Sequence, residues 1–183
     1  MRVGAQCPSI EVRSLRGASI TLPSDGDRLT HLQFRRFAGC PICNLHLRSV
    51  ARRIDEIVAA KVVEVAVFHS EAATMAPYLG DLPFEVIADP DKALYRAYGV
   101  EASVSSLLHP RAWLAFARGV AAAHPSGSMA GEGGHVGLPA DFLIDTSGRV
   151  LALKYGEHAD DQWSVDEILA QAREARRGGG RAG

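Results

Sequence analysis

Apolar runs typical of buried strands alternate with segments of helical spacing along most of the chain. Residues 29–37 contain recurring apolar residues and are expected to form the first central strand. Residues 62–68 are a nearly continuous apolar run broken by Glu64, as expected for a strand covered on both faces of a sheet. Between them, apolar residues recur every three or four positions over 47–58, which predicts a helix that begins after Cys40 and ends near Ala60. A strand, a helix and a second strand in this order predict a βαβ unit with parallel strands.

The same alternation continues after this unit. Ser70 is placed to cap a short helix, and residues 84–88 have the composition of another strand. Asp89 and Pro90 then form an N-cap and first-turn pair, which predicts a helix that ends at Tyr98 because a glycine follows directly. These elements add one strand and two helices to the predicted sheet.

Two hairpins flank the βα elements. Short alternating pieces at 10–12 and 20–22 enclose a turn that contains a glycine, and strands at 140–144 and 149–155 are joined by a short polar turn. We therefore expect an antiparallel hairpin at the N-terminal edge of the domain and a second hairpin that completes the sheet.

The βα order is interrupted between residues 101 and 137. Helical spacing at 110–123 is followed by a glycine-rich loop at 124–137, which would be a functional lid, an interface element or disordered. After the second hairpin, a capping box at 164–167 opens a final helix that we expect to run to about Arg176.

The composition is that of an ordinary globular protein. The chain has 183 residues, 47% of them hydrophobic and 22% charged, so we expect a single domain over 1–176 and a disordered tail over 177–183. A net charge of −1 gives no positive field for nucleic acid, and no apolar stretch approaches the roughly 20 residues of a membrane span. Because the N-terminus lacks a signal-peptide core, we expect a cytoplasmic protein.

The candidate chemistry lies at Gly39-Cys40-Pro41-Ile42-Cys43, where the first central strand gives way to a helix. At the helix N-terminus, free backbone N–H groups and the helix dipole favour the thiolate of Cys40, whereas Cys43 lies one turn inside. Pro41 suits the first helical position, because its fixed φ is helical and its missing N–H has no partner there. The pattern predicts thiol–disulfide exchange in which Cys40 attacks and Cys43 resolves.

Metal binding and inert packing are the alternative interpretations of this pair. A zinc site needs four ligands, but no second CxxC or HxxxH follows, and the histidines at 46, 124, 135 and 158 lack a recognisable ligand spacing. Cys7 stands alone before a proline and is expected to be a packed small side chain. The sequence therefore favours redox chemistry, with no cofactor expected.

The order of elements around the CxxC resembles the thioredoxin fold. The segment from Gly137 to Asp145, Gly-Leu-Pro-Ala-Asp-Phe-Leu-Ile-Asp, is similar to the proline segment of that superfamily. The resemblance implies that the Leu138–Pro139 bond is cis and that Pro139 faces the CxxC as a third site residue.

Other features are similar to the peroxiredoxin-like branch, the alkyl hydroperoxide reductase and thiol-specific antioxidant type. They are the N-terminal hairpin, the Phe-Leu-Ile-Asp and Gly-Arg-Val signature at 142–150, and Tyr98-Gly99-Val100. The resemblance implies an α/β protein with a thioredoxin-like fold: a central mixed β-sheet flanked by helices, an N-terminal β-hairpin, and a helix-plus-loop insertion before the cis-proline strand.

The chain departs from both family patterns beside the cysteines. Peroxiredoxins have a proline seven residues and a threonine or serine three residues before the peroxidatic cysteine, where this chain has Gln33 and Phe37. Phe34 stands where thioredoxin has a buried aspartate that helps to deprotonate the resolving cysteine. The peroxide-activating motif and the usual proton acceptor are therefore both missing.

Four nearby polar residues are candidates for these roles. Strand alternation sends Arg35 and Arg36 to opposite faces, so at most one of them can approach Cys40 and lower its pKa. His46, one helical turn after the CxxC, is either a proton acceptor or a half-buried packing residue. Asp141 either lies near the site or caps a strand end.

Three functional hypotheses follow. The leading one is a thiol–disulfide redox enzyme that uses Cys40 and Cys43. The second is a thiol-dependent peroxidase that uses the same cysteines, and the third is a copper- or zinc-binding or redox-silent interaction module, for which His135 is a candidate ligand. The expected partners are a disulfide or peroxide substrate and a thioredoxin-type or low-molecular-weight thiol reductant; a homodimer is compatible with the sequence.

Overall fold

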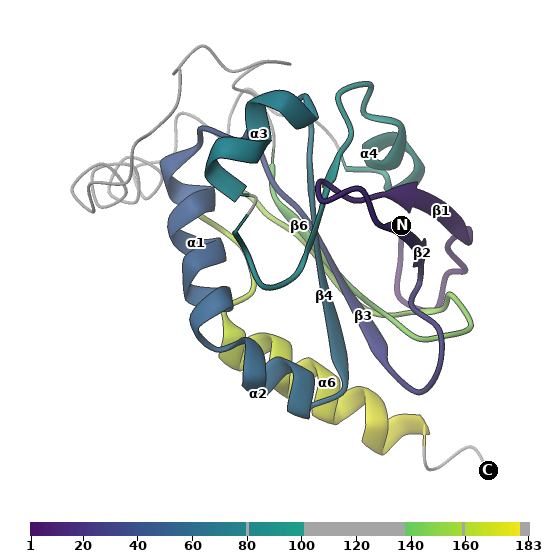
Figure 1. Cartoon of the computed structure of the whole chain (residues 1–183). Helices are drawn as coiled ribbons and strands as arrows, with labels where there is room; N and C mark the ends of the chain where they lie inside the picture. Colours follow the sequence, from purple (N-terminus) through teal and green to yellow (C-terminus); the bar gives the residue numbers. More distant parts are fainter. Residues whose placement is uncertain (80, 101–137, 159, 180–183) are drawn as a thin grey trace.

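A five-stranded mixed β-sheet forms the centre of the molecule (Figure 1). The computed structural model describes residues 1–79, 81–100, 138–158 and 160–179. The strands of this sheet are, in chain order, β3 (Leu29–Phe34), β4 (Val62–Phe68), β5 (Glu85–Ala88), β6 (Ala140–Ile144) and β7 (Val150–Tyr155). In space their order is β5-β4-β3-β6-β7, so β3, the strand that leads to the CxxC, lies at the centre.

The strand directions follow from the connections. Helical crossovers join β3, β4 and β5, and these strands are parallel, whereas β6 is antiparallel to both β3 and β7. The predicted strand at 62–68 is confirmed at the same residues, and the predicted hairpin at 140–155 is confirmed with its turn at 145–149. The central sheet is therefore the mixed sheet that the sequence predicted.

Helices cover both faces of the sheet. The helices are α1 (Pro41–Arg52), α2 (Ile54–Ala59), α3 (Ala72–Leu79), α4 (Ala93–Tyr98) and α6 (Val165–Gly179). Figure 1 shows α1, α2 and α6 together on one side and α4 with the N-terminal hairpin on the other. None of the helices in the described ranges is long and apolar enough to span a bilayer.

Strand alternation gives the two faces different cores. On the α4 side, Phe34, Tyr98 and Phe142 pack edge to face or tilted, with ring centroids 5.3–5.7 Å apart, and Tyr95 joins them through Phe34 at 4.9 Å. On the α1 and α6 side, Leu47, Val50, Ile57 and Ile168 form an aliphatic core. The side chains of His31 and Gln33 in β3 lie on this second face, which α1 covers.

The predicted N-terminal hairpin is confirmed. Strands β1 (Ile10–Arg13) and β2 (Ser19–Leu22) pair antiparallel, with Ile10 opposite Leu22. Cys7, which precedes the hairpin, is 3% exposed, and its thiol donates to the Gly148 carbonyl at 3.0 Å, as expected for a packed small side chain.

Helix boundaries differ from the predictions at three places. The helix expected from Cys40 to Ala60 is broken at Arg53, whose φ of −117° is not helical, into α1 and α2. Helix α4 begins at Ala93 rather than beside Pro90, although the Asp89 carboxylate still caps it by accepting from the N–H groups of Ala93, Leu94 and Tyr95.

At the C-terminus, the predicted capping box is present, because the Ser164 N–H donates to the Glu167 carboxylate at 2.7 Å and the Glu167 N–H donates to Ser164 Oγ at 3.3 Å. The helix continues to Gly179, so residues 177–179 are helical and do not belong to a disordered tail. The predicted helix at 110–123 and loop at 124–137 lie outside the described residues.

Candidate active site

The two cysteines lie at the start of α1, as the sequence predicted. Cys40 is the N-cap residue, with an extended backbone (φ −68°, ψ 112°), and Pro41 occupies the first helical turn. The Asn44 N–H donates to the Cys40 carbonyl at 3.0 Å, which closes the first helical hydrogen bond and places Cys43 in the first turn. Both thiols are free and buried, with Cys40 1% exposed and Cys43 0% exposed.

The short segment before Cys40 is held by hydrogen bonds to two other elements. The Ala38 N–H donates to the hydroxyl of Ser70 at 3.1 Å, so Ser70 supports this segment, in place of the expected helix-capping role. The Ala38 carbonyl accepts from Asn44 Nδ2 at 3.0 Å, and the Cys40 N–H donates to the Phe37 carbonyl at 3.0 Å. These bonds fix the position of the Cys40 sulfur at the helix start.

The surroundings of the two thiols separate their acidities. The hydrogen bond from the Cys43 thiol lowers the pKa of Cys40 most, and the charge of Arg36 lowers it further against the opposing effect of burial, from 9.0 to about 7. The same hydrogen bond, together with burial, raises the pKa of Cys43 well above 9.0. The pair is therefore arranged with Cys40 as the thiolate and Cys43 as the protonated partner, the order expected from the helix start.

Only one of the two arginines before Cys40 approaches the sulfur. Arg36 Nη1 lies 4.0 Å from Cys40 Sγ, and the Arg36 guanidinium lies 5.6 Å from the centre of the Phe37 ring. Arg35 turns to the other side, and its Nη2 donates to Asp141 Oδ1 at 2.7 Å. This is the division that strand alternation predicted.

Arg35 is completely buried, and polar atoms surround its guanidinium. Besides Asp141, the guanidinium donates to Gln33 Oε1 at 2.7 Å, to the Phe34 carbonyl at 3.1 Å and to His46 Nε2 at 3.3 Å. Asp141 is also fully buried and accepts a second bond, from the Trp163 N–H at 3.1 Å. Asp141 is thus a structural anion beneath α1, and the expectation that it caps a strand end is wrong.

A second buried ion pair continues this network. His31 Nδ1 donates to the Glu64 carboxylate at 2.7 and 2.9 Å, and His31 Nε2 donates to Asp141 Oδ1 at 3.2 Å. Gln33 Nε2 also donates to Glu64. We call the group of His31, Gln33, Arg35, Glu64 and Asp141 the buried charge network. It contains two cations and two anions when His31 is protonated.

The charges in the buried charge network stabilise each other. Burial alone would lower the pKa of His31, but the charge of Glu64 and the hydrogen bonds to Asp141 and Glu64 raise it from 6.5 to about 9. Burial alone would raise the pKa of Asp141, but the charge of Arg35 and the hydrogen bond from His31 hold it well below its usual range. His31 is therefore protonated and Asp141 ionised at neutral pH.

His46 does not have the properties of a proton acceptor. Because an arginine N–H only donates, the bond from Arg35 makes Nε2 of His46 the acceptor nitrogen and places the ring proton on Nδ1. Burial and the charge of Arg35 lower the pKa of His46 to about 3. The histidine is a neutral, half-buried residue, and the proposed catalytic role is not supported.

Pro139 differs from the arrangement that the family resemblance implied. Among the described residues the one cis peptide bond is Leu22–Pro23, so Leu138–Pro139 is trans. The trans isomer is the more stable form of an X–Pro bond. The Pro139 carbonyl accepts from the Gly156 N–H at 2.8 Å and thereby extends the pairing of β6 with β7. Pro139 lies against Gly156 and, together with Leu138 and Tyr155, lines a small cavity.

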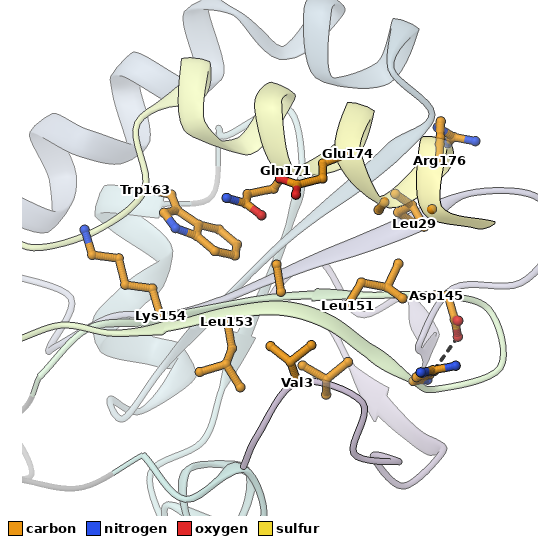
Figure 2. A pocket seen from close by; sticks show the side chains of 15 residues that line it. Val3, Leu29, Asp145, Leu151, Leu153, Lys154, Trp163, Gln171, Glu174 and Arg176 are labelled. Carbon is orange, nitrogen blue, oxygen red and sulfur yellow. Dashed lines mark hydrogen bonds between the residues drawn. The ribbon is translucent and has the colours of Figure 1, made fainter. Parts of the chain in front are cut away.

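The cysteines do not line the cavity between β7 and α6. A hollow of about 930 Å³ runs along β7 and α6, where Trp163 and Lys154 lie at one end and Arg176 at the other (Figure 2). Within the described ranges, no three or more His, Cys, Asp or Glu side chains are grouped in a way that could hold a metal ion. His135, the candidate metal ligand, lies outside these ranges.

The fold and the paired thiols at the start of α1 place the chain in the thioredoxin-fold class of thiol proteins. The chain belongs to the AhpC/TSA family, whose model matches residues 3–153. Membership of this family supports a thiol redox function, and thus an oxidoreductase. No match to the chain was found among curated proteins.

Solved structures with the same fold include two kinds of thiol protein. A reduced 2-Cys peroxiredoxin from Plasmodium vivax is 16% identical with a TM-score of 0.71, over 98% of this chain and 99% of that chain. Peroxidoxin BcpB from Mycobacterium tuberculosis is 16% identical with a TM-score of 0.66, over 95% and 97%. A putative thiol:disulfide interchange protein DsbE from Chlorobium tepidum is 20% identical with a TM-score of 0.61, over 94% and 99%. At these identities the similarity is one of fold.

The buried charge network is the part of the site that sequence reasoning missed. Its signal in the sequence is weak but present: Glu64 interrupts the apolar run of β4, and polar residues occupy alternate positions at His31 and Gln33 in β3 and at Arg35 directly after it. Alternate polar residues in a buried central strand indicate an internal polar cluster. Identifying their partners requires the register, which pairs His31 with Glu64 and Gln33 with Asp141.

The Cys40 thiol should titrate near pH 7 in the reduced protein. Arg36→Met removes the positive charge at 4.0 Å and should raise the pKa of Cys40. Thiolate absorbance against pH measures both values, and Arg52→Met, at the exposed far end of α1, is the matched control that should leave the titration unchanged. A wild-type midpoint at or above 9.0 would contradict the assignment of Cys40 as the thiolate.

His31 should make stability depend on pH in the alkaline range. Its pKa is raised from 6.5 to about 9, so its contribution is fully present below pH 6.5 and is lost as the pH rises through 9. The lowered pKa of Cys40 acts with the opposite sign between pH 7 and 9, so the measurement belongs in a Cys40→Ser background.

In that background, the difference in unfolding free energy between the parent and His31→Gln should shrink between pH 6.5 and 9. The full loss is on the order of 3 kcal/mol at 1.36 kcal/mol per pKa unit. Denaturant unfolding at several pH values measures the difference, and NMR of the His31 ring in the parent gives a second measurement if the variant fails to fold. A ring that is neutral at pH 7.5 would refute the proposed charge state.

Proposed function

We propose that the protein is a dithiol–disulfide oxidoreductase in which Cys40 is the nucleophile and Cys43 the resolving thiol. The observation that carries the proposal is the separation of the two acidities, with the pKa of Cys40 lowered and that of Cys43 raised by one shared hydrogen bond. A nucleophile with a pKa near the ambient pH combines a large thiolate fraction with good intrinsic reactivity. The helix start and Arg36 supply the positive potential that such a thiolate needs.

The reaction follows from this division of roles. The Cys40 thiolate attacks one sulfur of a substrate disulfide, forms a mixed disulfide and releases the other sulfur as a thiolate, which takes up a proton. Cys43 then loses its proton and attacks Cys40, which releases the second substrate thiol and leaves a Cys40–Cys43 disulfide. The substrate gains two electrons and two protons, and a thioredoxin-type or low-molecular-weight thiol restores the dithiol. Once Cys40 is in a mixed disulfide it carries no charge, so the effect that raises the Cys43 pKa is relieved.

A thiol-dependent peroxidase is the second candidate, and two observations favour it. Arg36 lies beside Cys40, where a cation can stabilise a departing oxygen, and a sulfur that is 1% exposed is easier for a small peroxide to reach than for a protein. In that reaction Cys40 becomes a sulfenic acid as the peroxide is reduced, and Cys43 condenses with it to release water.

Two other observations oppose efficient peroxide reduction. Phe37 is an apolar, buried side chain three residues before Cys40 and offers no hydroxyl to align a peroxide. The Cys40 N–H donates to the Phe37 carbonyl and is therefore not available to a bound oxygen.

For a metal-binding or redox-silent interaction module, no specific observation in the described ranges argues in favour. A cytoplasmic location and a homodimer stay predictions.

The roles of the two cysteines can be separated by trapping. Cys43→Ser should accumulate a mixed disulfide through Cys40, because only the resolving step is lost, whereas Cys40→Ser should abolish exchange. Mass spectrometry of the protein after reaction with a peptide disulfide locates the adduct, and Cys7→Ser is the matched control that should behave as wild type. An adduct on Cys43 in the Cys40→Ser protein, formed at the wild-type rate, would reverse the assignment.

Disulfide and peroxide chemistry can be separated by comparing rates. We expect insulin-type disulfide reduction with a dithiol donor to be readily detected, while the reduced protein reacts with peroxide little faster than a free thiolate of equal pKa. Stopped-flow measurement of reduced protein with hydrogen peroxide gives the second rate. A peroxide rate that exceeds the free thiolate by about 100-fold or more, the contribution typical of a placed oxyanion donor, without disulfide reduction would establish the peroxidase instead.

A further inference from the structure

A small cavity lies beside α1, one helical turn from the resolving cysteine. Its volume is about 330 Å³, at the lower end of the range for ligand pockets, and its walls come from α1 and from the segment that leads into α6. The residues that matter here are His46 and Ser49 on α1 and Gln162 on the opposite wall. His46 follows Cys43 by three positions, and side chains at this spacing are neighbours on a helix surface, with Cβ atoms about 5–6 Å apart.

Gln162 is the unusual residue of this cavity. The residue is 8% exposed, and within the part of the chain that the structure describes neither Nε2 nor Oε1 has a hydrogen-bond partner. A buried carboxamide without partners loses its hydration and gains nothing in return, which costs roughly 1–3 kcal/mol. Native proteins satisfy most such groups, so an orphaned amide in a cavity wall points to a ligand. Turning the side chain into the cavity breaks no protein hydrogen bond.

His46 supplies a donor of fixed orientation to the same cavity. Arg35 donates to Nε2, which leaves the proton on Nδ1, and the histidine is neutral because its pKa is lowered to about 3. No hydrogen bond from Nδ1 occurs within the described ranges. Arg53 also lines the cavity, but its guanidinium is already bound to Glu56 and Asp166. Asp160 adds a carboxylate to the lining. The neutral groups open to a ligand are therefore one carboxamide and one N–H donor.

The chemistry of these groups selects the kind of ligand. An ionised carboxylate or a phosphodiester can accept from Nε2 but cannot donate to Oε1 of Gln162, whereas a peptide group does both. In an extended chain the N–H and C=O of one residue point to the same side, as they do when two residues of paired strands exchange both of their hydrogen bonds. A glutamine carboxamide can make the same pair of bonds, and the neighbouring carbonyl can accept from His46.

We propose that this cavity is a subsite for an extended peptide segment next to the disulfide that Cys40 attacks. The proposal rests on the disulfide-exchange function and specifies its substrate class as a polypeptide disulfide. The wall that carries Gln162 also contacts the Pro139 region, because the Asp161 carbonyl and Pro139 Cγ both lie against Gly156. Because His46 lies one helical turn after Cys43, a chain bound along this wall would run beside α1.

The test compares three disulfides with the intact protein and a dithiol donor. The substrates are a ten-residue peptide disulfide with extended flanks, glutathione disulfide, and bis(2-hydroxyethyl) disulfide, which has no amide. Gln162→Met keeps the size of the side chain but removes both polar atoms. We expect it to lower the ratio of kcat/KM for the peptide over the hydroxyethyl compound by about tenfold, the effect of one or two lost hydrogen bonds. Gln171→Leu, on α6 in the distant cavity, is the matched control.

Two further measurements separate an effect of Gln162→Met on peptide binding from an effect on folding or on redox activity. Gln162→Met should not lower the free energy of unfolding, because neither amide atom loses a partner. A fluorescent copy of the peptide with serine in place of cysteine should bind wild type more tightly than Gln162→Met.

The outcomes distinguish the two proposals. If Gln162→Met also lowers kcat/KM for glutathione disulfide, short peptide disulfides use the subsite as well. If it lowers kcat/KM for the ten-residue peptide alone, only longer polypeptides use it. Both results support the subsite. Two results overturn the subsite while leaving disulfide exchange intact. One is an equal loss of kcat/KM for all three disulfides, and the other is an unchanged ratio of kcat/KM for the peptide over the hydroxyethyl compound together with unchanged peptide binding. Wild-type protein that reduces none of the three disulfides overturns the proposed function, and the peptide subsite falls with it.

Discussion

The ion pair between Arg35 and Asp141 joins the elements that carry the site. It links the end of β3 to the start of β6, and through the Trp163 N–H and His46 it reaches the segment before α6 and the helix α1. Both charges are completely buried, so neither can be solvated if the other is removed. Loss of one partner of such a pair typically costs about 3–5 kcal/mol, which makes this contact the constraint on the relative positions of the sheet and the CxxC helix.

The same ion pair determines which arginine can act on the sulfur. Because the guanidinium of Arg35 is saturated by Asp141, Gln33 and a backbone carbonyl, Cys40 receives its positive neighbour from Arg36 alone. The buried charge network is neutral overall when His31 is protonated, so it adds no large net charge beneath the thiols. The acidity of Cys40 is therefore set locally, by Cys43, Arg36 and the helix start.

Much of this arrangement could be predicted from the sequence, and the remainder depends on long-range register. The strand at 62–68, the two hairpins and the place of Cys40 at a helix start follow from local patterns of apolar residues, turns and caps. The contacts of the buried charge network with Glu64 and Asp141 join residues that are 31 to 110 positions apart, and no local pattern indicates such pairs. The trans bond before Pro139 was missed because the cis expectation came from family resemblance and not from a pattern in the residues themselves.

The departures from the peroxiredoxin pattern change the chemistry without changing the scaffold. Phe37 removes a hydroxyl from the neighbourhood of the sulfur, and the stacked Arg36 keeps a cation there, so the site retains an acidic thiol but loses a means of aligning a peroxide. A thiolate without peroxide alignment reacts according to access and to how well a substrate is held. Since Cys40 is almost fully buried, a substrate that is anchored beside α1 gains most from the proximity of its disulfide. Selection between disulfide and peroxide in this protein therefore depends on binding next to the cysteines more than on the acidity of Cys40.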